Sequence, residues 1–135
     1  MPLSDQDSFD TEVVGHYEDP YHRGPLEGWT HACEASSPIC ADFVRMELRI
    51  TADEKIEDAW FDGDGCLVSQ AAASLLAEHV EGMSVDQARS FSATDMLTLF
   101  GTSCPPSRQK CCLLAWRVFQ QALESPVDLD CDDSV

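Results

Sequence analysis

The sequence predicts an α+β fold, in which a three-stranded antiparallel sheet packs against about five helices. Residues 44–50 alternate strictly between apolar and charged side chains, which indicates a strand with one buried face. Residues 67–80 carry apolar side chains at helical spacing. The strand patterns follow one another and the helical patterns come after them, an order typical of an antiparallel meander with helices packed on it.

The elements are expected in the following order. The predicted strands share alternating side chains and are residues 29–35, 40–50 and 56–61. The predicted helices share apolar positions at helical spacing and are residues 8–19, 67–80, the segments after the capping boxes 84–87 and 92–95, and 107–123. Ser107 is the expected N-cap of the last helix. That helix is apolar on most of its circumference, which predicts a central position.

The chain is expected to form one domain, residues 8–124, between a flexible N-terminus at 1–7 and an acidic flexible tail at 125–135. Eight Lys and Arg stand against 25 Asp and Glu, a formal net charge of −17. Binding DNA or RNA needs cations that neutralise phosphate, so we expect no nucleic-acid partner. An acidic surface of this kind keeps a protein solvated and also attracts a basic partner protein.

The sequence favours a cytoplasmic protein with no membrane partner. Its apolar runs are shorter than a membrane span, and the first residues lack the basic start and apolar segment of a signal peptide. Disulfides are rare in the cytoplasm, so the seven cysteines point to metal or redox chemistry.

Three cysteines and one aspartate form the candidate metal site. Cys40 and Asp42 are two residues apart on a predicted strand, so their side chains share one face. Cys66 follows Gly65 where a helix is predicted to begin, and Cys111 lies in the first turn of the last helix. Unpaired backbone N–H groups at a helix start favour negative charge, and therefore the thiolate that binds metal or acts as a nucleophile.

Neighbouring residues add to this site. Lys110 places a cation beside Cys111, and Gly63 and Gly65 allow the backbone to approach a ligand closely. Thiolates with one carboxylate suit zinc or an iron–sulfur centre, although the chain has no Cys-x-x-Cys pair and burial in the core remains the alternative. The other cysteines are interpreted as small buried residues, with Cys112 also a candidate spare ligand: Cys33, Cys104, Cys112 and Cys131.

Four motifs resemble those of the NifU/IscU/SufU family of iron–sulfur assembly scaffolds, in the same order and with similar gaps. They are His16-Tyr17-Glu18-Asp19-Pro20 with Gly24, Pro38-Ile39-Cys40-Ala41-Asp42, the run GDGCLVSQAAAS at 63–74, and the run PSRQKCCLLAW at 106–116. The resemblance spans about residues 9–123. It implies the SufE/IscU-like fold, which is the α+β arrangement already predicted.

The motifs combine features of two branches of that family. Lys110 stands where IscU members have a histidine, which is similar to SufU, whereas the stretch from Cys66 to Cys111 has the length found in IscU. Ala41 replaces a glycine of the second motif. The segment Cys104–Arg108 occupies the place of the chaperone-binding segment of IscU but keeps only its two prolines, so a chaperone contact there is left open.

The resemblance implies a scaffold rather than an enzyme. A cysteine desulfurase would deliver sulfur to Cys111 as a persulfide, and iron would enter at Cys40, Asp42 and Cys66. A transient [2Fe–2S] cluster would then pass to apo iron–sulfur proteins or downstream carriers. Asp42, as a weaker oxygen ligand to iron, is expected to make the cluster labile.

Two alternatives to the scaffold remain open. The first is a zinc-dependent sulfurtransferase of the SufU type, in which Cys40, Asp42, Cys66 and Cys111 hold Zn²⁺ and Cys111 relays sulfur. The second is a zinc-stabilised interaction module without sulfur chemistry.

Overall fold

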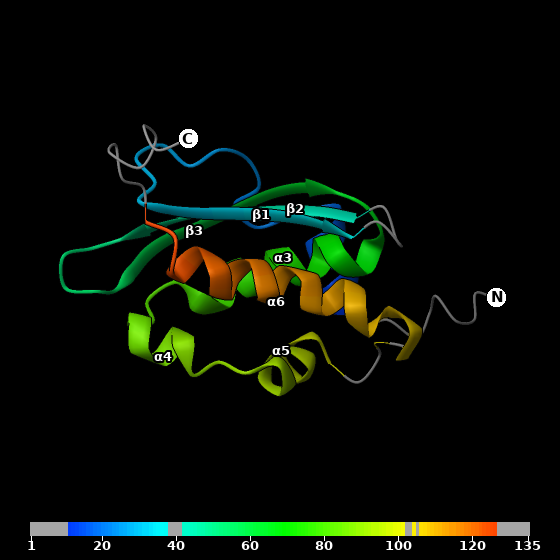
Figure 1. Ribbon diagram of the computed structural model, residues 1–135. Coiled ribbons are helices and arrows are strands. Elements are labelled where there is room, and N and C mark those ends of the chain that lie inside the picture. Colours follow the sequence, from blue (N-terminus) through cyan, green and yellow to red (C-terminus); the bar gives the residue numbers. More distant parts are fainter. Residues whose placement is uncertain (1–10, 38–41, 102–103, 105, 127–135) are drawn as a thin grey trace.

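The computed structural model describes residues 11–37, 42–101, 104 and 106–126. Its strands form one antiparallel sheet in the order β1 (His31–Ser37), β2 (Asp42–Ile50) and β3 (Ile56–Asp64). Its α-helices within these residues are α2 (Thr11–Glu18), α3 (Leu67–Val80), α4 (Val85–Arg89), α5 (Ala93–Phe100) and α6 (Gln109–Leu123). Helices α3 to α6 lie on one side of the sheet, with α6 next to it and α4 and α5 further out (Figure 1). The predicted α+β fold is confirmed.

Strand β2 is the centre of the sheet and sets which side chains face the helices. Val44, Met46 and Leu48 are completely buried, and Asp42 at the start of the strand lies on the same face with 0% exposure. Strand β3 runs three residues beyond the predicted end at Phe61, because Gly63 and Asp64 still pair with the start of β2. This extension brings the end of β3 to the side of Asp42.

Helix α6 is central, as its sequence predicts. It packs against β1, β2, α3 and α5, and its buried side chains include Leu114, Val118 and Phe119. The facing surface of α3 is rich in buried alanine, which lets the two helices and the sheet approach closely. Among the described residues, no helix has both the length and the apolar content needed to cross a membrane.

The helix starts differ in how they are capped. Ser84 and Ser92 each complete a capping box, with the reciprocal bonds made by Gln87 and Asp95, as predicted. The prediction of Ser107 as N-cap of the last helix is wrong. Ser107 lies inside a 3-10 turn, η1 (Pro106–Arg108), and the N-cap position of α6 falls on Arg108, which makes no side-chain cap bond.

Two glycines let the end of β3 approach the start of β2. A Cβ on Gly63 would lie 2.1 Å from the Phe43 carbonyl oxygen, and one on Gly65 would lie 2.2 Å from Asp42 Oδ1. Gly65 also has a φ of +141°, a conformation that side-chain-bearing residues rarely adopt. The close approach expected of these glycines is therefore made to the β2 backbone and to Asp42 itself.

The residues after α2 are held against α3 by two side chains, the buried Ser74 and the half-buried Glu81. Ser74 Oγ accepts a hydrogen bond from Tyr21 N at 2.7 Å and lies 2.6 Å from His16 Nδ1. His16 Nε2 in turn lies 3.1 Å from a Glu78 oxygen one turn further along α3. The N-terminal motif and the motif that contains Ser74 thus meet in the fold.

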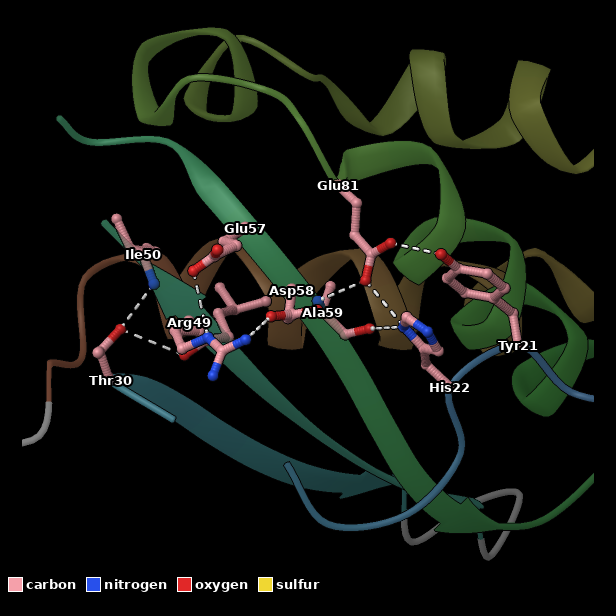
Figure 2. A network of polar contacts seen from close by, with 10 residues as sticks. Tyr21, His22, Thr30, Arg49, Ile50, Glu57, Asp58, Ala59 and Glu81 are labelled. Atoms are coloured by element: carbon pink, nitrogen blue, oxygen red, sulfur yellow. Dashed lines mark hydrogen bonds and ion pairs between the residues drawn. The ribbon is translucent and has the colours of Figure 1, made fainter. Parts of the chain in front are cut away.

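Glu81, at the C-terminal cap of α3, holds the second contact (Figure 2). Its carboxylate accepts hydrogen bonds from Tyr21 Oη at 2.5 Å and Ala59 N at 2.9 Å, and it lies 2.8 Å from His22 Nδ1. The His22 ring stacks between Tyr21 and Trp60, with centroid separations of 3.9 and 4.5 Å. Glu81 therefore joins α3, β3 and the loop after α2 at the end of α3 opposite to Cys66.

Gly65→Ala is expected to lower the free energy of unfolding by about 2 kcal/mol or more, because the new Cβ meets Asp42 and the backbone conformation is strained. Urea denaturation followed by circular dichroism measures this change. Gly15→Ala is the matched control, since a Cβ on Gly15 has nothing within 4 Å and Gly15 lies within α2. The control should leave stability unchanged or slightly higher; equal effects of the two substitutions would contradict the proposed contact.

The Tyr21 phenol is expected to lose its proton only at an unusually high pH. Its hydrogen bond to Glu81, together with burial, raises the pKa of Tyr21 from 10.0 to about 12. Because the folded pKa is raised, the stability from this contact is complete below pH 10 and is lost as the pH rises through about 12. In a Tyr17→Phe variant Tyr21 is the single remaining tyrosine, so ultraviolet absorbance reports its ionisation directly.

Adding Glu81→Gln to the Tyr17→Phe background removes the carboxylate that keeps the Tyr21 phenol protonated. The midpoint of the titration should then fall toward the ordinary value for tyrosine. An unchanged midpoint would show that Glu81 does not control the ionisation of Tyr21.

Candidate metal centre

Three side chains from distant parts of the sequence converge at one end of the sheet. The ligand atoms of Asp42, Cys66 and Cys111 all lie within 4.8 Å of one another. Asp42 begins β2, Cys66 caps the start of α3, and Cys111 is the third residue of α6. Cys40, the fourth residue of the candidate site, lies outside the described residues, two positions before Asp42.

The Asp42 carboxylate is held by the backbone of α3. Asp42 Oδ1 accepts a hydrogen bond from Cys66 N at 2.8 Å, while Oδ2 lies 3.6 Å from Cys66 Sγ. A fully buried carboxylate is strongly destabilising unless it is hydrogen-bonded, so this bond is what allows Asp42 to be 0% exposed. The bond uses Oδ1 and directs Oδ2 toward the sulfur.

Cys66 itself acts as the N-cap of α3. Its Sγ accepts a hydrogen bond from Ser69 N at 3.5 Å, and Ser69 Oγ donates to the Cys66 carbonyl oxygen at 3.2 Å. Gln70 Nε2 donates to Ser69 Oγ at 3.0 Å and so fixes that hydroxyl. The sulfur therefore sits at the N-terminal, positive end of the α3 dipole.

Cys111 and Lys110 differ sharply in their exposure. The Cys111 side chain is 1% exposed, whereas Lys110, one residue earlier in α6, is exposed at the surface. Among the described residues, no carboxylate lies within ion-pair distance of the Lys110 ammonium. The candidate site thus combines the buried Cys111 thiol with the exposed Lys110 ammonium of the preceding residue.

The donor set fits a thiophilic metal ion. Zinc–thiolate bonds of about 2.3 Å place tetrahedral ligands about 3.8 Å apart, so the three donor atoms need to approach one another by at most about 1 Å. Two thiolates with a carboxylate suit zinc or iron better than magnesium or calcium, which prefer oxygen. A closed tetrahedral site needs a fourth donor, and Cys40 is the nearest candidate in the sequence.

A further pair of thiols lies beside this centre. Cys112 is 0% exposed and Cys104 is half-buried, and each of the two thiols affects the pKa of the other. Burial raises the pKa of Cys112 to about 12 and also raises the pKa of Cys104, so both are protonated thiols at neutral pH. The Cys104 thiol also interacts electrostatically with Cys66.

Sequence reasoning interpreted these two cysteines separately and did not anticipate their contact. They are eight residues apart on either side of a proline-containing turn, and no local pattern indicates that the turn folds one onto the other. Cys33 lies elsewhere, with its Sγ 3.4 Å from Gln121 Oε1 near the C-terminal end of α6. Cys131 is outside the described residues.

Known proteins share both the sequence pattern and the fold. The chain is 28% identical over 128 residues to the zinc-dependent sulfurtransferase SufU of Bacillus subtilis (strain 168), covering 82% of this chain and 86% of that protein. It is 30% identical over 129 residues to the iron–sulfur cluster assembly scaffold protein IscU of Streptococcus pyogenes serotype M1, covering 83% and 80%.

A solved structure and a family model each match nearly the whole chain. The crystal structure of a nitrogen-fixing NifU-like protein (N-terminal) from Brucella abortus superposes with a TM-score of 0.75, covering 90% of this chain and 96% of that one. At 16% identity this match supports the fold alone. Residues 8–126 match the family described as NifU-like N terminal domain. The chain therefore belongs to the NifU-like N-terminal domain family.

Proposed function

We propose that this protein is an iron–sulfur cluster assembly scaffold, which accepts sulfur from a cysteine desulfurase, assembles a transient [2Fe–2S] cluster and hands it to apo-proteins or downstream carriers. The observation that carries the proposal is the convergence of the Asp42, Cys66 and Cys111 donor atoms within 4.8 Å. The relative named as an IscU scaffold supports it. The cytoplasm suits this function because thiols stay reduced there.

Cys111 is the proposed persulfide acceptor. Its sulfur is close to the Cys66 sulfur and the Asp42 carboxylate, so sulfur bound to it arrives where iron would be held. At 1% exposure it cannot meet a partner's persulfide directly, so the surrounding chain must move during transfer. Lys110 offers an exposed positive charge that would attract the anionic persulfide to this place.

Iron would be held by Cys66, Asp42 and, from the part of the chain outside the described residues, Cys40. Asp42 is the proposed reason that the cluster can leave. Its Oδ1 already accepts the Cys66 N–H, which leaves Oδ2 as the oxygen available to iron. A single hard oxygen ligand binds iron in a sulfide cluster more weakly than a thiolate does.

Asp42→Ala is expected to lengthen the lifetime of a reconstituted cluster and to slow its transfer to an apo-ferredoxin by about tenfold, because the weakest ligand is removed. Visible absorbance follows both processes. Asp42→Asn keeps an oxygen that can accept the Cys66 N–H, so it separates loss of the ligand charge from loss of that hydrogen bond. Asp62→Ala, which removes an exposed carboxylate from β3, is the charge control and should change neither rate. Unchanged lifetime and transfer in both Asp42 variants would contradict the role.

A zinc-dependent sulfurtransferase is the second candidate function. It is favoured by Lys110 beside Cys111, by a donor set that equally suits zinc, and by the relative named as a zinc-dependent sulfurtransferase. Cys40, Asp42, Cys66 and Cys111 would then hold zinc, and Cys111 would take up sulfur and pass it on. The protein would be an enzyme in this case and a non-enzymatic scaffold in the first.

Metal analysis after anaerobic purification separates the two functions. Zinc, iron and acid-labile sulfide are measured first, and a cysteine desulfurase with cysteine and ferrous iron is then added. Under the scaffold proposal we expect acid-labile sulfide and a visible cluster that an apo-ferredoxin can take up. Retained zinc, a persulfide on Cys111 and no cluster would instead select the sulfurtransferase. Cys111→Ser should abolish sulfur uptake in both cases.

A further inference from the structure

Helix α3 places one amide side chain in the core next to the metal centre. Gln70 is 5% exposed, and its backbone N–H donates to the Cys66 carbonyl oxygen at 3.2 Å. The other buried residues of α3 are apolar, except Ser69 and Ser74. A methionine would fill the same space without bringing an amide into the core, so packing alone does not account for this side chain.

The Gln70 amide connects the start of α3 to the start of β2. Its Nε2 donates to Ser69 Oγ at 3.0 Å and to the Phe43 carbonyl oxygen at 3.4 Å. Phe43 directly follows Asp42 in β2. These partners also fix which way the amide points, because the reversed amide would set its oxygen against the carbonyl oxygen of Phe43.

The oxygen of the same amide lacks a partner of this kind. Among the described residues, no donor lies within hydrogen-bond distance of the buried Gln70 Oε1. This oxygen packs against Gly63, where a Cβ would lie 3.3 Å from it. A buried acceptor without a donor destabilises a fold. The amide therefore costs stability at this position, which points to a role that an apolar side chain could not fill.

Ser69 transmits the constraint from Gln70 to Cys66. The Ser69 hydroxyl donates to the Cys66 carbonyl oxygen at 3.2 Å, and the Ser69 backbone N–H donates to Cys66 Sγ at 3.5 Å. The Gln70 amide nitrogen therefore holds two groups at once. One is the residue that fixes the backbone and sulfur of Cys66, and the other is the carbonyl group next to Asp42.

We propose that Gln70 is a positioning residue that holds the Asp42 and Cys66 donors at a fixed separation through metal loading and release. This inference rests on the proposed function and deepens it, because it assigns Gln70 to the same metal centre. Hydrogen bonds to groups behind the ligands orient those ligands in metal sites and strengthen metal binding.

Two routes join the Asp42 and Cys66 donors, and they respond differently to a metal ion. The direct bond from Cys66 N to Asp42 Oδ1 uses an oxygen of a candidate ligand, so it can lengthen when the carboxylate turns toward a metal ion. The route through Gln70 and Ser69 uses a backbone carbonyl, a hydroxyl and an amide, which are outside the ligand set. This second route can persist when the metal enters and leaves, and it keeps the donors in place for the next round.

Gln70→Met tests the inference, because it keeps the length of the side chain and removes both hydrogen bonds of the amide. Amide hydrogen exchange is measured first, by NMR on the reduced, metal-free full chain. The Cys66 and Ser69 N–H groups should exchange about fivefold faster, as expected for the loss of one hydrogen bond. The midpoint of urea denaturation should stay the same or rise, because the unpartnered buried oxygen is removed as well.

Metal binding by the same chain is measured next. Co²⁺ serves as the probe, because its visible absorption reports thiolate ligation and tetrahedral geometry. In competition with a chelator, Gln70→Met should bind Co²⁺ about tenfold more weakly than the unmodified chain does. The absorption bands of bound Co²⁺ should also shift, because the ligands are less well oriented.

Gln120→Met is the matched control for this substitution. Gln120 also donates to two backbone carbonyl groups, but it lies nine residues along α6 from Cys111. The control should leave both hydrogen exchange at Cys66 and the affinity for Co²⁺ unchanged.

A Ser69→Ala background shows whether Gln70 acts through Ser69. Gln70→Met should weaken Co²⁺ binding less in this background than in the unmodified sequence, because the two residues belong to one chain of hydrogen bonds. Circular dichroism shows whether Gln70→Met folds. If it does not, Gln70→Asn decides the question, because its side chain is one methylene shorter and cannot reach both partners.

Three results would overturn the inference: unchanged exchange at Cys66 in Gln70→Met, unchanged Co²⁺ affinity in that variant, or the same loss of affinity with and without Ser69. Failure of the proposed function gives a different result, in which the unmodified chain binds Co²⁺ but takes up no sulfur from a cysteine desulfurase. If the unmodified chain binds no Co²⁺, hydrogen exchange in the metal-free chain still decides whether Gln70 holds Cys66 in place.

Discussion

The hydrogen bond from Cys66 N to Asp42 Oδ1 joins the first residue of β2 to the cap of α3, and the metal centre depends on it. It stabilises a carboxylate with no solvent exposure and fixes the distance between two donor side chains that are 24 residues apart. Gly65 makes the bond possible, because a side chain at that position would occupy the place of the Asp42 oxygen. Removing either partner would leave a buried polar group unsatisfied, so geometry and stability are coupled here.

The three donors of the centre are held by two different parts of the fold. Asp42 and Cys66 belong to one unit, in which α3 is fixed to the sheet at its start by this hydrogen bond and at its end by Glu81. Cys111 belongs to α6, which is reached through η1. A metal ion bound by all three side chains would therefore link α6 to the sheet–α3 unit, and its departure would remove that link.

Much of this arrangement can be predicted from the sequence where the signal is local. The alternation at 44–50 predicts both the central strand and the inward direction of Asp42, because side chains two apart in a strand share a face. The capping boxes at Ser84 and Ser92 predict two helix starts, because each box consists of residues three apart. The resemblance of four motifs predicts the family.

Contacts between distant residues could not be predicted in this way. The pairing of Cys104 with Cys112, the binding of Tyr21 and His22 by Glu81, and the extra residues of β3 depend on how separate segments pack, and single-sequence patterns do not encode such packing. The wrong cap at Ser107 has a similar cause, since the turn around Pro106 decides where helical geometry begins. The part of Cys40 in the site stays a prediction.

The start of α6 lacks the side-chain cap found at the starts of α3, α4 and α5, and it carries the proposed reactive cysteine, Cys111. Helices α3, α4 and α5 each begin with a side chain that caps the first turn, whereas α6 begins at Arg108 with no side-chain cap. A serine or aspartate cap typically adds about 0.5–2 kcal/mol, so α6 forgoes this stabilisation. Cys111 lies in this first turn, where the backbone N–H groups of a helix carry partial positive charge. Among α3, α4, α5 and α6, the helix without a side-chain cap is therefore the one that carries Cys111 in its first turn.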